Sequence, residues 1–221
     1  MAPVGKIYSY PNNFRVQRAQ AIAALNGLEL EVPSDFQFGK DNKTPEFLAK
    51  FPFGKVPAFE SADGKFCFAE AQAIARYLAE IGPKAGQLLG EDPQTRAIIE
   101  QWCCFAEQEM GAYTSPPLVM VLFKVQPFEE AWYNRSMDNF ARALKRLDVA
   151  VKGKKFLVGD QLTLADIMVL GPLQLAGRFM MDAEMRKEAP NVEGYMKGLL
   201  EIPELRQAFG EPQLCEKRMT V

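Results

Sequence analysis

Apolar positions follow two different periods along this chain. In the first part, KIYSY (residues 6–10) and LELEV (residues 28–32) alternate as half-buried strands do. Between them, residues 14–25 carry apolar side chains at helical spacing, and Asn26 with Gly27 ends that pattern. The pattern therefore predicts a strand, a helix and a second strand.

A short helix, a hairpin and a third helix are expected next. Thr44 is a good N-cap, and Pro45 suits the first helical position. VPAFES and KFCFAE are strand-like runs joined by the turn sequence ADG. Helical spacing then returns from Ala69 to Ile81. Residues 1–82 therefore have the order β-α-β-α-β-β-α, which predicts a small α/β domain.

After residue 92 every long segment has helical spacing. The preceding segment, 83–92, is rich in Gly and Pro and is expected to be a linker. Helices are predicted over residues 94–111, 127–151, 162–177 and 191–200. The expected fold class is thus α/β plus all-α, with an all-α domain and a C-terminal tail in residues 93–221.

Thr163 and Asp166 form the clearest capping signal. They stand three residues apart, just before the apolar run IMVLGPLQLAG. In a capping box the threonine hydroxyl accepts from the Asp166 amide, and the aspartate accepts from the Thr163 amide. We expect a buried helix at the centre of the second domain and a structural, not catalytic, role for Asp166.

Composition narrows the possible chemistry. The 221 residues are 48% hydrophobic, and the net charge of −2 argues against nucleic acid as a partner. There is no histidine, which excludes histidine-activated nucleophiles and histidine metal ligands. The four cysteines lack zinc or disulfide spacing, so we expect no metal, and reduced thiols in a cytoplasmic protein. No run approaches the roughly 18 apolar residues of a membrane span.

Pro57 stands where a strand is expected to begin. Because proline cannot donate to a sheet, it suits the first residue of a strand, an edge or a bulge. A cis Val56–Pro57 bond, which we predict, would turn the Val56 amide and carbonyl outward. An ordinary transition from loop to strand is the plain alternative.

These features resemble a known family. The β-α-β-α-β-β-α order with Val-Pro opening its third strand resembles the thioredoxin-like half of cytosolic glutathione transferases. The helical half around LTLADIMV resembles their C-terminal domain. NKTPEFLAKFPFGKVPAFES, FLVGDQLTLADI and the tail LCEK are similar to the transferase-like N-terminal domain of the gamma subunit of translation elongation factor 1. The resemblance covers essentially the whole chain and implies the glutathione transferase fold.

The resemblance implies where glutathione would bind. In the family, the residue before a cis proline pairs its backbone with the cysteinyl part of glutathione, which assigns this role to Val56 beside Pro57. Lys43 and Lys55 match positions that reach the glycine carboxylate, and solvated surface is the alternative for both.

The γ-glutamyl end of glutathione needs a second set of groups. Glu70 matches the family's acid that meets the ammonium. Ala71 replaces the serine that, with the helix N-terminus, holds the carboxylate. The backbone amides and the helix dipole would still bind the carboxylate, but more weakly, because one lost hydrogen bond to a charged group costs about 1.5–3 kcal/mol.

The sequence indicates less clearly which residue would activate the thiol of glutathione. Family enzymes lower the thiol pKa of glutathione with one hydroxyl near the end of the first strand or in the loop behind it. Ser9 aligns with the tyrosine of some classes and Asn13 with the serine of others, and these two are the catalytic candidates. Tyr8 and Tyr10 are expected on the opposite face, unless the alignment shifts by one residue. Arg15 either adds positive potential or faces solvent.

Two functions remain open. The first is an enzyme that conjugates the thiolate of its co-substrate glutathione to small electrophiles, bound in an apolar site near Met110, Tyr113 and Phe123. The second is a non-catalytic elongation-factor gamma-type scaffold in a translation nucleotide-exchange complex, with elongation-factor subunits as partners. The family normally continues beyond CEKRMTV, so the chain resembles either an excised domain or a free-standing relative.

The resemblance also implies a homodimer, in which the α/β domain of one chain meets the helical domain of the other. Phe51 and Phe53 are expected as exposed aromatic anchors of that contact. The alternative is that these rings complete the core of their own domain.

Overall fold

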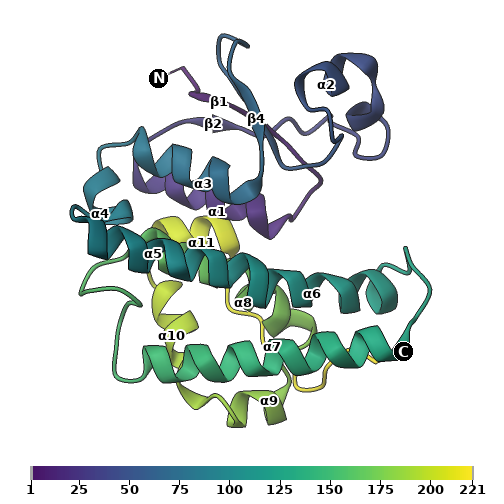
Figure 1. Cartoon of the computed structure of the whole chain (residues 1–221), viewed down its shortest axis with the longest axis vertical. Helices are drawn as coiled ribbons and strands as arrows, with labels where there is room; N and C mark the ends of the chain where they lie inside the picture. The colour runs from purple at the N-terminus through teal and green to yellow at the C-terminus, as the bar shows by residue number, and fades with distance from the viewer. Residues whose placement is uncertain (1, 221) are drawn as a thin grey trace.

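The computed structural model describes residues 2–220, which form two packed parts (Figure 1). The upper part in Figure 1 holds the sheet, with α1 and α3 beneath it, and the lower part is entirely helical. The architecture expected from the sequence, α/β followed by all-α, is confirmed.

The sheet has four strands in the order β2-β1-β3-β4. β1 runs parallel to β2 and antiparallel to β3, and β3 runs antiparallel to β4. The strands and helices of this part are β1 (Gly5–Tyr8), α1 (Phe14–Leu25), β2 (Leu30–Glu31), η1 (Asp41–Lys43), α2 (Pro45–Lys50), β3 (Ala58–Ser61), β4 (Cys67–Ala69) and α3 (Ala71–Glu80).

Side chains cap two helices of this part, and of these the Thr44 cap is the one that the sequence predicted. The Asn13 side chain accepts from the Arg15 amide at the start of α1, at 3.1 Å. The Thr44 hydroxyl accepts from the Phe47 amide at the start of α2, at 3.3 Å. The second strand is shorter than its alternation suggested, because only two of its residues pair with β1.

The helical part contains more elements than the period alone predicted. Its elements are α4 (Ala85–Leu89), α5 (Pro93–Phe105), η2 (Ala106–Gly111), α6 (Ala112–Pro117), η3 (Leu118–Leu122), α7 (Glu130–Val151), α8 (Leu164–Phe179), α9 (Ala183–Lys187), α10 (Pro190–Leu199) and α11 (Pro203–Phe209). From Pro93 to Leu122 the chain is helical throughout, but η2 and η3 are π-helical. Such wide turns rotate the following side chains and often occur at functional sites.

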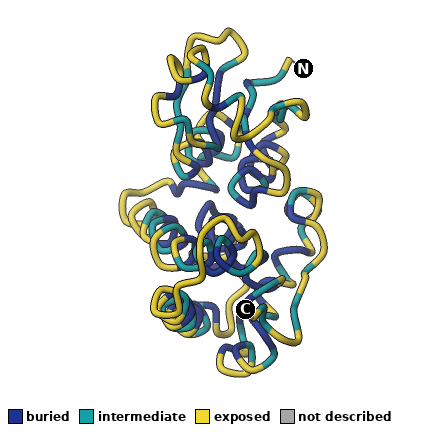
Figure 2. The backbone as a smooth tube through the Cα atoms, turned by 90° about the vertical axis from the view of Figure 1, so that its right-hand side faces the viewer, coloured by how far each residue is buried: buried dark blue, intermediate teal, exposed yellow. Residues whose placement is uncertain are grey.

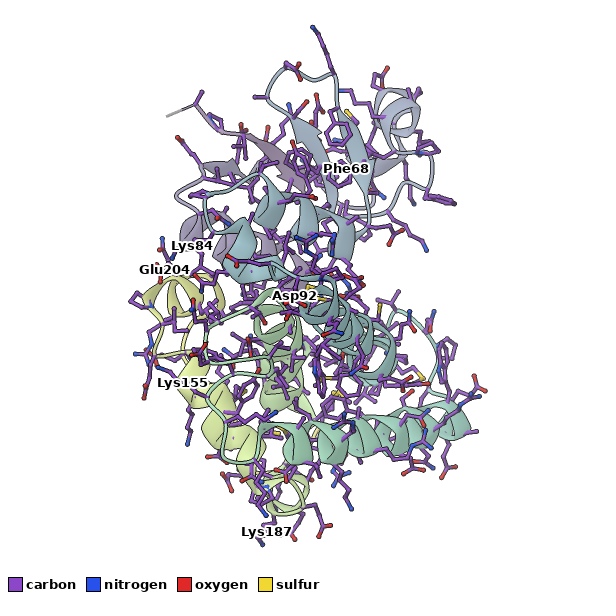
Figure 3. All side chains as sticks on the ribbon, turned by 60° about the vertical axis from the view of Figure 1, so that its left-hand side comes forward. Phe68, Lys84, Asp92, Lys155, Lys187 and Glu204 are labelled. Carbon is purple, nitrogen blue, oxygen red and sulfur yellow. The ribbon has the colours of Figure 1, made fainter. Side chains whose placement is uncertain are left out.

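The segment expected to be a linker, residues 83–92, contains the short helix α4. Leu88 and Leu89 of α4 are buried in the same core as the sheet residues Ile7 and Phe59. Lys84 and Asp92 lie at the junction of the two parts in Figure 3. Figure 2 shows buried backbone on both sides of this junction. The two parts therefore share one continuous hydrophobic core.

The predicted capping box of α8 is present. The Asp166 carboxylate is fully buried and accepts from the Thr163 amide at 2.9 Å. It also accepts from the Leu157 amide at 2.8 Å and from the Tyr195 hydroxyl at 2.7 Å. Its hydrogen bonds thus join three segments of the helical part, as expected for a structural residue.

The two aromatic rings expected as dimer anchors lie in different environments. Phe51 is buried, with its ring centroid 4.8 Å from that of Phe47 and 6.0 Å from that of Tyr8. The expectation of an exposed Phe51 is therefore wrong, because its ring packs in a buried cluster with Phe47 of α2 and Ala58 of β3. Phe53, in contrast, is 84% exposed.

Among residues 2–220, no helix has both the length and the apolar character needed to cross a bilayer.

Candidate functional site

A groove opens where the sheet part meets the helical part. It has a volume of about 360 Å³. Its walls come from α1, the segment before β3, the β4–α3 junction and η2. The lining residues are Arg15, Phe53, Lys55, Val56, Pro57, Ala69, Glu70, Ala71, Gln72 and Glu107. We refer to it as the Pro57 groove.

Of the six residues that the resemblance assigned to glutathione binding, five meet in the Pro57 groove: Lys55, Val56, Pro57, Glu70 and Ala71. The Val56–Pro57 bond is cis, as predicted. Within residues 2–220, the backbone amide and carbonyl of Val56 have no hydrogen-bond partner. Both groups are therefore free to pair with an extended ligand.

The start of α3 forms the opposite end of the groove. Glu70 has φ +79° and ψ +114°, a left-handed conformation that is rare outside glycine. No side chain in the described part of the chain caps the first turn of α3. The amides of this turn and the positive end of the helix dipole are thus available to a carboxylate. Backbone strain of this kind tends to occur at binding sites.

Lys43 does not line the groove. It is exposed at the end of η1. The neighbouring Asn42 is buried and its side-chain amide donates to the Gly54 carbonyl at 2.6 Å, next to Lys55. This bond ties the Lys43 loop to the segment that carries Lys55, but the ligand role of Lys43 remains a prediction.

Ser9 and Asn13 are held together away from the groove. The Asn13 side-chain amide donates to the Ser9 hydroxyl at 3.0 Å, and both residues are buried. Neither lines the Pro57 groove. Their catalytic role remains a prediction, and their observed contacts cap and anchor the start of α1.

The tyrosines beside Ser9 point elsewhere, as strand alternation suggested. The Tyr8 hydroxyl donates to the Glu60 carboxylate at 2.9 Å, and burial together with this bond raises its pKa well above the usual value. Lys50 donates to the other Glu60 oxygen at 2.8 Å. The Tyr10 ring contacts the Phe38 ring at a tilt of 57°, with ring centroids 5.6 Å apart. Neither tyrosine lines the Pro57 groove.

Arg15 supplies the positive charge on the α1 side of the groove. Its Nε lies 3.7 Å from a Glu107 carboxylate oxygen, and its guanidinium lies 4.5 Å from the Phe14 ring. The other Glu107 oxygen accepts from Arg18, which is fully buried and also donates to the Met168 carbonyl. Burial lowers the pKa of Arg18 from its usual value, and Glu107 acts against that shift.

Sequence reasoning missed several lining residues. Gln72 follows directly after Glu70 and Ala71, so its place on the first turn of α3 was accessible from the sequence. Glu107 was not, because it reaches the groove through the π-helical turn η2, in a segment where only a regular helix was predicted.

The apolar site expected near Met110, Tyr113 and Phe123 is not formed by these three residues. Met110 is fully buried in the core and cannot contact a ligand, whereas Phe123 is 61% exposed. None of the three lines the Pro57 groove.

The charges of the Pro57 groove are balanced. Arg15 and Lys55 contribute two cations, and Glu70 and Glu107 contribute two carboxylates. With free backbone groups at Val56 and at the start of α3, this arrangement suits a short peptide that carries both an ammonium and carboxylates. No cluster of side chains that could hold a metal ion is found in residues 2–220.

Comparisons with known proteins show which family this chain resembles. Residues 3–80 match the family model "Glutathione S-transferase, N-terminal domain", and residues 112–203 match "Glutathione S-transferase, C-terminal domain". The glutathione S-transferase-like protein LUC7 of a Fusarium species is 43% identical over 218 residues, covering 98% of this chain and 97% of the relative. Human elongation factor 1-gamma is 36% identical over 220 residues, covering 96% of this chain but only 48% of the relative.

Solved structures show the same fold at lower identity. The glutathione S-transferase-like domain of elongation factor 1-gamma from Saccharomyces cerevisiae has a TM-score of 0.80 at 20% identity, with 99% of both chains covered. The glutathione transferase URE2P6 from Phanerochaete chrysosporium has a TM-score of 0.83 at 22% identity, with 94% of this chain and 96% of that chain covered. The family models and the relatives together identify this chain as a member of the glutathione S-transferase family.

Proposed function

We propose that this chain binds glutathione in the Pro57 groove and transfers its thiolate to small electrophiles in the cytoplasm. The observation that carries the proposal is the unpaired amide and carbonyl of Val56, which lie in one groove with Lys55 and Glu70. Each of these groups complements one part of the tripeptide.

The chemistry of the lining residues suggests where each part of glutathione lies in the groove. The cysteinyl residue pairs with the Val56 backbone as an added strand. The glycine carboxylate lies toward Lys55, and the γ-glutamyl carboxylate lies at the first turn of α3. The ammonium lies against the Glu70 carboxylate. Ala71 offers no hydroxyl at this end, so the affinity is expected to be weaker than with a serine there.

Arg15 is the group best placed to favour the thiolate. The thiolate, not the thiol, is the nucleophile, and a nearby cation lowers the thiol pKa. The thiolate sulfur would form a bond to an electrophilic carbon, and the electron pair would move to the leaving group or into the acceptor's conjugated system. Ser9 and Asn13 are the alternative thiol partners, and both would need to become accessible to reach a sulfur atom.

Relatives support glutathione as the co-substrate. The solved structure of URE2P6 is described as a complex with oxidized glutathione, and that of a glutathione S-transferase I as bound with lactoylglutathione. Both are 25% identical or less to this chain, so they support the fold and, by analogy alone, the ligand. The four cysteines are free thiols, which agrees with a reducing compartment.

A scaffold function is the second candidate. It is favoured by the 36% identity to elongation factor 1-gamma, of which this chain spans about half the length. In this case the fold would bind elongation-factor subunits, and the groove would have no catalytic use. The missing hydroxyl at Ala71 agrees with this alternative as well.

The two functions are separated by assaying purified protein with glutathione and 1-chloro-2,4-dinitrobenzene. The enzyme proposal expects retention on immobilised glutathione and conjugation above the uncatalysed rate. Neither retention nor conjugation is expected of a scaffold, and that pair of results would replace the enzyme with the second candidate.

A further inference from the structure

Two arginines of α1 share one carboxylate in the wall of the Pro57 groove. Glu107 lines the groove, and one of its oxygens lies 3.7 Å from the Arg15 Nε. The other Glu107 oxygen accepts from Arg18. The two arginines are three residues apart in α1, so they lie on neighbouring turns of the same helix face. Two cations therefore meet one anion at this wall.

Arg18 itself is out of reach of a ligand in the groove. Its side chain is fully buried and does not line the groove. It donates to Glu107 and to the Met168 carbonyl of α8, and its Nε has no hydrogen-bond partner within residues 2–220. Its guanidinium lies 4.9 Å from the Phe14 ring. Any effect of Arg18 on a bound ligand must therefore act through Glu107.

The charges of this network do not cancel. A guanidinium keeps its proton in proteins, so two cations and one carboxylate leave one positive charge in excess. Because Arg18 is buried, its field is screened less by salt than the field of a surface charge. The other charged groups that line the groove, Lys55 and Glu70, are one cation and one anion. Without Arg18, Glu107 would neutralise Arg15.

We infer that Arg18 is a positioning residue for the glutathione thiolate, because it binds Glu107 and so leaves the charge of Arg15 free to act on the sulfur. The inference rests on the proposed function, in which the sulfur faces Arg15. The thiol proton goes to water, the electron pair stays on the sulfur, and no atom of Arg18 touches glutathione. Glu107 has the opposite effect, since its negative charge disfavours the thiolate.

The test is the thiol pKa of glutathione bound to the full chain, measured from the ultraviolet absorbance of the thiolate across a pH series. Arg18→Met should raise this pKa by about half a unit or more, because Glu107 then neutralises Arg15. Glu107→Gln should lower the pKa, because both cations then act without a carboxylate. The double variant should return to the wild-type value, since Arg15 remains as one unpaired cation.

These shifts separate an electrostatic role of Arg18 from a merely structural one. A structural role would change the stability of each variant, but it would not move the thiol pKa in opposite directions. If Arg18→Met or Glu107→Gln alone does not fold, the double variant still tests the inference, because it leaves no buried charge without a partner.

Arg186→Met is the matched control. The Arg186 side chain is 12% exposed, pairs with Glu193 at 3.1 Å and donates to two backbone carbonyls. It belongs to α9 (Ala183–Lys187), which lies at the opposite end of the molecule from the sheet (Figure 1). Its loss should destabilise the helical part and leave the thiol pKa of bound glutathione unchanged.

Titration calorimetry with glutathione distinguishes a failure of this inference from a failure of the proposed function. A wild-type chain that binds no glutathione would overturn both. If the wild type binds glutathione, but Arg18→Met has the wild-type thiol pKa or the double variant has a clearly different one, only the inference about Arg18 is overturned.

Discussion

Arg18 and Glu107, which are 89 residues apart in the chain, form an ion pair across the junction of α1 and η2. The Arg18 side chain is fully buried, whereas that of Glu107 is 21% exposed and also approaches Arg15. Gly171 leaves the space that the buried Arg18 side chain occupies, because a Cβ at position 171 would lie 2.7 Å from the Arg18 Nε. The Glu107 carboxylate thus connects Arg18 in the shared core with Arg15 in the wall of the Pro57 groove.

Replacing Glu107 by Gln should destabilise the fold. Removing one partner leaves an uncompensated buried charge, which costs about 3 kcal/mol of unfolding free energy or more. The double variant Arg18→Met with Glu107→Gln should recover much of the loss, because the buried charge is removed as well. Urea unfolding measures both effects.

The matched control for this pair is Lys145→Met with Glu188→Gln. That ion pair joins α7 to the segment after α9, and its side chains are 58% and 68% exposed. Its loss should cost less than about 1 kcal/mol. If Glu107→Gln costs no more than the control, the Arg18–Glu107 pair does not hold the two parts together.

Much of the fold followed from short-range patterns. The helix Phe14–Leu25 was predicted at its observed bounds, and Thr163 with Asp166 indicated the start of α8, because caps and apolar spacing act within a few residues. The buried Phe51 was missed because its burial depends on Tyr8 of β1 and Ala58 of β3 as well as on Phe47, its neighbour one turn earlier in α2. Local sequence does not show which face a neighbouring element will cover.

The site was predictable only in part for the same reason. Lys55, Val56 and Pro57 are consecutive, and Glu70 with Ala71 opens the next helix, so a resemblance over short motifs was enough to select them. Glu107 reaches the groove from the helical part through a π-helical turn. No periodic pattern encodes that turn, and the pairing with Arg15 exists only after the two parts pack.

Glu60 should make the stability depend on pH. Burial acts to raise the pKa of its carboxyl, but the hydrogen bonds from Lys50 and Tyr8 outweigh burial and hold the pKa below the usual value. The stabilisation is therefore complete above the unfolded pKa of about 4.3 and is lost as the pH falls through the lower folded value. Urea unfolding between pH 5 and pH 3, values chosen to span about that range, should show a steeper loss for the wild type than for Glu60→Gln. Equal slopes would contradict this account.

Arg15→Gln should raise the thiol pKa of bound glutathione by about 1 unit or more, because an opposite charge nearby favours the thiolate. Ultraviolet absorbance of the thiolate across a pH series measures the pKa. Arg135→Gln, on the exposed side of α7, is the control. If Ser9→Ala or Asn13→Ala raises the thiol pKa and Arg15→Gln does not, the hydroxyl and amide candidates replace Arg15.

Glu70→Gln should weaken glutathione binding by roughly 1–3 kcal/mol, since it removes the charge that faces the ammonium. Ala71→Ser should strengthen binding by restoring a donor at the start of α3. Titration calorimetry measures both variants, with Glu80→Gln at the far end of α3 as the control. Unchanged affinity in both would mean that this end of the groove does not bind the γ-glutamyl group.

Phe53 should anchor a homodimer. We expect sedimentation at about twice the chain mass of 24.8 kDa, and a shift toward the monomer in Phe53→Ser, because the ring is exposed at the edge of the groove. Phe38→Ser, which removes another exposed ring, is the control. A wild-type chain that sediments only as a monomer at micromolar concentration would refute the dimer.

A crystal structure of the chain soaked with millimolar glutathione would show directly whether the Pro57 groove binds it. We expect glutathione in the Pro57 groove, with its cysteinyl backbone paired to Val56 and its ammonium against Glu70. The sulfur should face Arg15. An empty groove at this concentration, or glutathione bound elsewhere on the molecule, would contradict the account.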